Sequence, residues 1–233
     1  RSPRAGETFV CAPMARSLEA IATSGGEAFY RGELARTMAG DAKRHGALHT
    51  PEDFARHACD WVTPLGFDYR GTTVHEIPPN GQGIAALIAL GILQSLGPSD
   101  DAPDSVAAQH RAIEAMKLAF ADTYRYVADR AHMKVPPEAM LEPGYLATRA
   151  KLIDPARARD FGPGAPPAGG TVYLTTGDAQ GMMVSLIQSN YMGFGSGVVV
   201  PGTGISLQNR GAGFSLDPAH ANALEGGKRP FHT

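Results

Sequence analysis

A threonine stands directly after a glycine-ended stretch of the chain. Residues 154–170 are rich in Pro, Gly and Ala and end in Gly169-Gly170, and Thr171 then begins a strand-like run. A cut between Gly170 and Thr171 would leave the threonine with a free α-amine beside its own hydroxyl. An α-amine with a pKa of about 7.7–8.0 can accept the proton of an attacking oxygen. One residue would then supply both nucleophile and base, the N-terminal-threonine variant of that pair.

The same hydroxyl could also make the cut. Attack of the Thr171 hydroxyl on the Gly170 carbonyl would give an ester by an N→O shift, which water would resolve. Glycine before the bond offers little steric hindrance, and a loose linker would let the bond adopt a strained geometry. The same spacing also fits an ordinary linker before a strand with no chemistry, so the residues alone leave both interpretations open.

Other catalytic and binding motifs do not appear in the sequence. Residues 193–197 have the wrong spacing for a nucleophile elbow, and residues 226–229 lack the loop and the Ser/Thr of a P-loop. The eight histidines are scattered, and none is paired at metal-ligand spacing. Residues 201–204 could cradle an anion with backbone N–H groups or simply form a tight turn. No metal or organic cofactor is implied.

The composition excludes several classes of protein. The 233 residues carry 21 basic and 23 acidic side chains, a net charge of -2, so there is no basic field for nucleic acid. The longest apolar stretch, residues 83–96, is shorter than the ~20 residues that span a bilayer. Cys11 and Cys59 make no disulfide framework, although one bridge is possible.

The ends of the chain suggest a piece of a longer protein. The sequence opens at Arg1 rather than Met and stops abruptly after His232 and Thr233. No signal peptide is visible, but an internal piece would not carry one. The compartment is therefore left open between the cytoplasm and the periplasm or exterior.

Helical patterns dominate the chain before residue 154. Apolar side chains at three- and four-residue steps, with caps and glycine stops, predict the helices. They cover about residues 14–22, 29–38, 51–58, 83–96 and 105–129. Between the third and fourth, Trp61-Val62 and residues 72–77 are expected to be strands on either side of a turn at residues 69–71.

Strand patterns dominate after residue 170. Strands are predicted over residues 171–176, 182–189 and 204–209, and the turn at 177–181 joins the first two into a hairpin. Residues 154–170 are expected to be an exposed, mobile linker between the two parts. This order predicts an α+β fold, or a layered αββα sandwich whose sheet is only partly present.

Short blocks in a fixed order make the chain resemble the γ-glutamyltransferase family of N-terminal nucleophile hydrolases. The resemblance runs from about residue 8 to the end. The blocks that carry it are residues 28–32 (AFYRG), 78–83 (PPNGQG), 114–122 (EAMKLAFAD), 193–197 (GFGSG), 201–205 (PGTGI) and 227–230 (GKRP). Members of this family are made as one precursor that cuts itself before a threonine, and their fold is an αββα sandwich.

The resemblance implies how the chain is divided. Thr171 falls on the family's nucleophile, and Gly170–Thr171 on its cleavage point. Residues 1–170 would be the C-terminal part of the large subunit, ending in the linker 154–170, and residues 171–233 the start of the small subunit. The two halves of the processed precursor would stay together as each other's partners.

The resemblance also implies substrate-binding positions, some of which are altered. Ser189 falls where the family usually has a threonine beside the nucleophile, and Tyr191 where an asparagine often contacts substrate, with Asn190 next to it. Arg210 precedes a segment in which Ala212 and Gly213 replace two acids, one of which grips the donor's α-amino group in typical members. His232 and Thr233 match the Ser-Ser pair that holds the donor carboxylate. The family's oxyanion hole and donor-carboxylate arginine would lie outside these residues.

The function implied is hydrolysis or transfer of γ-glutamyl amides, such as glutathione, through an acyl-enzyme on Thr171. Water or an amine would be the acceptor, no nucleic-acid partner is expected, and no membrane span is expected in these residues. The altered clamp keeps a second possibility open, an acylase of the cephalosporin-acylase kind that acts on other amides. A third is an uncleaved, non-catalytic homologue that serves as a binding or scaffold protein.

Overall fold

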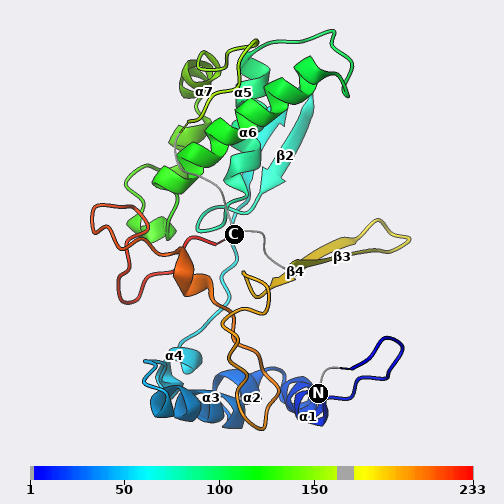
Figure 1. The fold of residues 1–233 in the computed structure, drawn as a ribbon, viewed down its shortest axis with the longest axis vertical. Coiled ribbons are helices and arrows are strands. Elements are labelled where there is room, and N and C mark those ends of the chain that lie inside the picture. Colours follow the sequence, from blue (N-terminus) through cyan, green and yellow to red (C-terminus); the bar gives the residue numbers. More distant parts are fainter. Residues whose placement is uncertain (1–2, 162–170, 233) are drawn as a thin grey trace. The chain divides into compact units, whose positions relative to one another are not determined.

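Two compact units share the chain, and each combines segments that are far apart in the sequence. The first holds Arg1–Asp60 with Ala168–Asn209, and the second holds Trp61–Pro167 with Arg210–Thr233. The computed structural model describes residues 3–161 and 171–232 (Figure 1). Gly170 and Thr233 therefore lie outside the described residues, and the division into subunits at Gly170–Thr171 stays a prediction.

Helices make up the N-terminal part of the first unit. They are α1 (Ala12–Thr23), α2 (Glu27–Tyr30), α3 (Glu33–Arg44) and α4 (Pro51–Ala55). Helix α4 begins with a capping box, in which the Thr50 hydroxyl accepts from the Asp53 N–H and the Asp53 carboxylate accepts from the Thr50 N–H. The predicted start of α4 at Pro51 is confirmed, although this helix ends at Ala55, and α1 covers the predicted residues 14–22 and begins two residues earlier. Leu34, Met38 and Val200 are the buried core of this unit.

The single helix predicted across residues 29–38 is wrong. The chain breaks at Arg31 and Gly32 and continues as two helices, α2 and α3. Gly32 has an extended ψ of -149°, and a Cβ at this position would lie 2.7 Å from the Cα of Ala28. The break brings two backbone segments so close together that only glycine fits, and a helical apolar pattern does not reveal such a contact.

A β-hairpin forms the C-terminal part of the first unit. Strands β3 (Thr171–Gly177) and β4 (Met183–Ser189) pair antiparallel, with Thr171 opposite Ser189 and Gly177 opposite Met183 (Figure 1). At the turn, one carboxylate oxygen of Asp178 accepts from the N–H groups of Gln180 and Met182, both at 2.9 Å. The predicted hairpin is confirmed.

Residues 204–209 do not form the predicted strand. They are joined to the stretch before the turn by an isolated bridge between Val199 and Ser206 and by separate backbone hydrogen bonds, such as that from the Leu207 N–H to the Val198 carbonyl at 2.9 Å. The turn itself packs against α1. Gly204 has a φ of +71°, and a Cβ there would lie 2.9 Å from the backbone nitrogen of Met14. The Ser17 hydroxyl of α1 donates to the Thr203 carbonyl at 2.8 Å. These contacts favour the tight-turn interpretation of residues 201–204 over an anion cradle.

The second unit contains a hairpin and the longest helix of the described chain, α6. Its elements are β1 (Leu65–Tyr69), β2 (Thr72–Glu76), α5 (Ile84–Ser95), α6 (Val106–Tyr126), the 3-10 helices η1 (Arg130–His132) and η2 (Pro137–Leu141), α7 (Pro143–Ala150) and the 3-10 helix η3 (Arg210–Gly213). The hairpin turn is where the sequence predicts it, but its first strand begins at Leu65. Trp61 and Val62 lie before this strand and form none of their own, and Trp61 is fully exposed. The strand predicted at Trp61-Val62 is therefore wrong.

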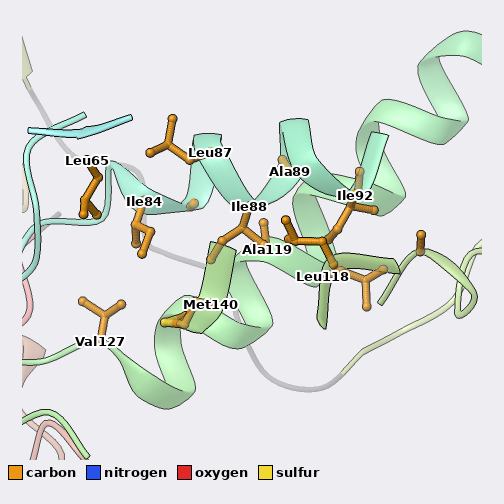
Figure 2. Close-up of a cluster of buried hydrophobic side chains, with 14 of the residues drawn as sticks. Leu65, Ile84, Leu87, Ile88, Ala89, Ile92, Leu118, Ala119, Val127 and Met140 are labelled. Carbon is orange, nitrogen blue, oxygen red and sulfur yellow. The ribbon is translucent and has the colours of Figure 1, made fainter. Parts of the chain in front are cut away.

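Helix α5 is the centre of the second unit's core. Ile84, Leu87, Ile88 and Ile92 have no exposed surface, which confirms that this nearly all-apolar helix is buried. Side chains from α6, η2 and α7 pack around it (Figure 2). Together these residues form one continuous hydrophobic cluster, and this cluster holds α5, α6, η2 and α7 together.

The first part of the expected linker is tied to α6. Residues 154–160 are mostly exposed, as expected. However, the His110 ring hydrogen-bonds the Asp154 carbonyl through Nε2 at 2.8 Å, and the Arg159 N–H donates to Glu114 at 3.0 Å. The mobility expected of residues 154–170 stays a prediction, and within this stretch these two main-chain groups are hydrogen-bonded to α6. Residues 162–170 lie outside the described residues.

Candidate active site

Thr171 is the first residue of β3, and its antiparallel partner is Ser189, the last residue of β4. The spacing of the sequence explains this pairing. The turn closes at Gly177 and Met183, and counting six residues back along each strand reaches Thr171 and Ser189. The candidate nucleophile and the hydroxyl residue expected beside it therefore occupy one register position at the open end of the hairpin.

The turn after β4 is shaped by the Ser189 side chain. Its hydroxyl oxygen accepts from the N–H of Tyr191 at 3.0 Å. Tyr191 has a φ of +76°, a conformation that non-glycine residues seldom adopt. Strained backbone of this kind is most common at functional sites. Asn190 and Tyr191 both lie in this turn, directly beyond the Thr171–Ser189 pair, and both remain candidates for substrate contact.

Asn209, which the residue pattern does not single out, holds this turn in place. Its N–H donates to the Asn190 carbonyl at 3.3 Å, and its side-chain oxygen accepts from the Met192 N–H at 3.1 Å. Gly195 makes room for the contact, since a Cβ there would lie 2.5 Å from the Leu207 carbonyl oxygen. The signal for Asn209 was its place beside Gln208 and Arg210 in a segment that matches the family.

Arg210 and His232 belong to the second unit. Arg210 begins η3, and the backbone of His232 is held on both sides, donating to the Asn80 carbonyl at 2.9 Å and accepting from the Gln82 N–H at 3.0 Å. Partial burial of the imidazole, together with the positive charge of Arg210, lowers the pKa of His232. The His232 ring is therefore largely neutral at pH 7, and of these two side chains only Arg210 carries a positive charge.

Ala212 and Gly213, the two positions at which the resemblance implies acids, have different surroundings. Ala212 is exposed. At Gly213 a Cβ would lie 3.3 Å from the Phe231 carbonyl oxygen, and the Gly213 carbonyl accepts from the Asn222 amide at 2.6 Å. A carboxylate introduced at position 212 has more room than one at position 213.

The remaining polar groups show no metal centre in the described part of the chain. Residues 3–161 and 171–232 contain no group of three or more His, Cys, Asp or Glu side chains placed to hold a metal ion. Cys11 and Cys59 are both free thiols. None of the helices within these ranges combines the length and hydropathy needed to cross a membrane.

The whole chain matches one family of known proteins. Residues 1–233 match the family model described as gamma-glutamyltranspeptidase, and the chain belongs to that family. The same match covers the candidate nucleophile, the turn after β4 and the segment around Arg210.

Among the similar relatives, the glutathione hydrolase-like YwrD proenzyme of Bacillus subtilis is 39% identical over 100% of this chain and 44% of its own. The oxamate amidohydrolase proenzyme of Klebsiella pneumoniae is 40% identical over 100% of this chain and 43% of its own. The crystal structure of cephalosporin acylase from Bacillus halodurans is 52% identical with a TM-score of 0.92, and the match covers 100% of this chain and 42% of that one.

These comparisons confirm the predicted fold class, the partial N-terminal nucleophile hydrolase fold. The chain spans less than half the length of the relatives it matches.

Proposed function

We propose that this chain carries the cleavage point and the nucleophile of a self-processing N-terminal-threonine amide hydrolase. The observation that supports it most is the register of the second hairpin, which places Thr171 at the head of β3 with Ser189 as its partner. Membership of the gamma-glutamyltranspeptidase family supports the same assignment, because the relatives are named as proenzymes.

Self-cleavage would proceed without any added reagent except water. The Thr171 hydroxyl oxygen bonds to the Gly170 carbonyl carbon, the peptide C–N bond breaks, and the nitrogen becomes the free α-amine of Thr171. Water then hydrolyses the ester, which leaves a carboxylate on Gly170 and returns the hydroxyl to Thr171. The products are residues 1–170 as the end of one subunit and residues 171–233 as the start of the other.

The mature site would then repeat this chemistry on a substrate amide. The α-amine of Thr171 accepts the hydroxyl proton as the oxygen attacks the carbonyl, and returns a proton to the leaving amine. An acyl-enzyme forms and is released by water or by an amine acceptor. Ser189, beside the nucleophile, and Asn190 or Tyr191, in the turn beyond it, are the residues assigned to orient the acyl group.

The family relationship makes γ-glutamyl amides the first candidate donors. A second candidate, acyl donors that have a carboxylate but no ammonium group, is favoured by a specific feature of this chain. Ala212 and Gly213 stand where typical members carry acids, and Arg210 adds a positive charge in the same segment. Losing a charge-assisted contact costs roughly 1.5–3 kcal/mol, or about tenfold to a hundredfold in binding. The similar relatives include an oxamate amidohydrolase, and oxamate has no ammonium group.

Two matched amides separate these candidates. The p-nitroanilides of γ-glutamate and of glutarate differ only in the α-amino group, so their kcat/KM ratio on the full-length protein measures recognition of that group. A ratio above tenfold for the γ-glutamyl compound supports the first candidate, and a ratio reversed in favour of the glutaryl compound supports the second.

A substitution at the altered clamp sharpens the same test. Ala212→Asp should raise the preference for the γ-glutamyl compound by about tenfold to a hundredfold, because it returns a carboxylate to the segment. Ala212→Asn is the control, since it has the same shape without the charge. Equal preferences in the two variants would contradict the assignment of this segment to the donor's α-amino group.

A further inference from the structure

The backbone of one residue before the cleavage point is held from both sides by an ion pair on α6. The Arg159 N–H donates to a carboxylate oxygen of Glu114 at 3.0 Å, and the Arg159 carbonyl accepts from the ammonium group of Lys117. Glu114 and Lys117 also pair with each other, with Oε1 and Nζ 2.7 Å apart. We call these two side chains the α6 clamp.

The α6 clamp is built into the folded core. The Glu114 side chain is 1% exposed, and it lies one turn from Leu118, which has no exposed surface. Burial by itself would raise the pKa of Glu114, but the hydrogen bonds from Lys117 and the Arg159 N–H outweigh it and lower that pKa. The carboxylate is therefore charged at neutral pH, and its partners satisfy it.

Neighbouring contacts hold the same stretch of chain at both of its ends. Upstream, the His110 ring hydrogen-bonds the Asp154 carbonyl. Downstream, the Lys117 ammonium lies 5.3 Å from the centre of the Phe161 ring, within cation–π range. These two contacts and the α6 clamp all come from one face of α6. The His110 contact and the clamp bind main-chain groups, so they set the path of the chain largely independently of its side chains.

This stretch leads directly to the candidate cleavage point. Arg159 precedes Thr171 by twelve residues, and Thr171 is itself fixed as the first residue of β3. Anchoring the backbone of Arg159 removes conformations that the chain would otherwise have at this point. Attack on the Gly170 carbonyl needs a near-attack arrangement of that peptide bond, and fewer competing conformations upstream favour it.

We propose that Glu114 and Lys117 are positioning residues for self-cleavage, because they anchor the backbone of Arg159 and thereby set where the segment leading to Gly170–Thr171 begins. This inference rests on the proposed function, since it concerns the rate of that cleavage. It assigns the α6 clamp no part in the later turnover of substrate.

Substitutions at Arg159 test the anchor without touching α6. In Arg159→Pro the backbone N–H that reaches Glu114 is absent, whereas Arg159→Ala keeps the N–H. Both variants lose the side chain and its 3.3 Å ion pair with Asp154, so their difference reports the N–H. The full-length precursor of each variant is produced by cell-free synthesis, and the uncut fraction is followed over time. We expect about a tenfold slower cleavage for Arg159→Pro and a rate within twofold of the wild type for Arg159→Ala.

Substitutions at Lys117 provide an independent test from the helix side. Lys117→Met removes the ammonium and keeps the side-chain stem, and we expect it to slow cleavage by about tenfold, while Lys117→Arg should restore most of the rate. The cleaved fraction of each variant is then purified, and its kcat, KM and melting temperature should match those of the wild type.

The outcomes separate the inference from the proposed function. A wild type that cleaves, with Arg159→Pro and Lys117→Met cleaving within twofold of it, would overturn the clamp and leave the proposed function standing. A parallel fall in cleavage, turnover and melting temperature would show a merely structural pair and would also overturn it. A wild type that does not cleave at all would remove the proposed function first.

Discussion

At the scale of single residues, Ser189 combines an observed contact with a proposed role. Its backbone is the register partner of Thr171, and its hydroxyl accepts the N–H of Tyr191 in a turn with positive φ. The contact shapes the turn that carries Asn190 and Tyr191, and the proposed role is to orient the acyl group beside Thr171. A substitution at Ser189 would therefore act on the proposed chemistry and on local structure together.

We expect Ser189→Ala to reduce kcat/KM by about tenfold, because the Tyr191 N–H loses a hydrogen bond worth ~1 kcal/mol and the position beside Thr171 loses its hydroxyl. Ser189→Thr, which keeps the hydroxyl and gives the residue typical of the family, should stay within about threefold of the wild type. The measurement is steady-state kinetics on the processed protein. An alanine variant as active as the threonine variant would show that the hydroxyl has no role.

At the scale of helices and strands, close approaches of the backbone decide where the pattern of apolar residues predicts the observed structure. Gly91 lies within α5, and a Cβ added there would come 2.4 Å from a methyl group of Leu146 and 3.1 Å from the Phe67 ring. Leu146 is itself 1% exposed, so its methyl group would have to move within a closely packed core. The glycine therefore sets how closely α5 and α7 pack.

Gly91→Ala should destabilise the protein by about 1–3 kcal/mol through overpacking, although alanine is the better helix former. Gly40→Ala in α3 is the matched control. There the nearest atom to an added Cβ is Arg44 Nη1 at 3.8 Å, so the substitution should be neutral or stabilise by up to ~1 kcal/mol. Thermal unfolding of both variants measures this, and a stabilising Gly91→Ala would contradict the packing described for α5.

The same contacts explain how much of the fold could be predicted from the sequence. Helix α5 and the capped start of α4 follow from apolar spacing and capping residues, which are local signals. The failures at the break before α3 and at residues 204–209 involve close contacts with backbone atoms, as with Gly204 against Met14. At Trp61-Val62 the residue types predict a strand, but Trp61 is fully exposed and the strand begins at Leu65.

The candidate site was predictable to a similar extent. The pairing of Thr171 with Ser189 follows from the length of each strand and the position of the turn between them. The part played by Asn209 and the grip of Glu114 on Arg159 could not be derived, because each joins a side chain to main-chain groups at a distance in the sequence. Residue types alone do not reveal contacts with main-chain groups.

At the scale of the whole molecule, the second hairpin indicates that the protein should be studied at full length. In the described part of the chain, Tyr173 and Ile187 on one face of the hairpin and Leu174 and Leu186 on the other are each at least half exposed. A two-stranded hairpin with apolar side chains on both faces is marginally stable by itself. The chain matches less than half the length of its relatives, so experiments on Thr171 belong in the complete protein.

The central claim is that Thr171 is freed as an N-terminal nucleophile. The most direct measurement is the intact mass of the purified full-length protein, with Thr171→Ala as the control. We predict two fragments that meet between Gly170 and Thr171 in the wild type, and one uncut chain in the variant. A wild type that remains a single chain would contradict the account, because a Thr171 whose amine is still in a peptide bond has no base of its own, and would favour a non-catalytic binding or scaffold protein.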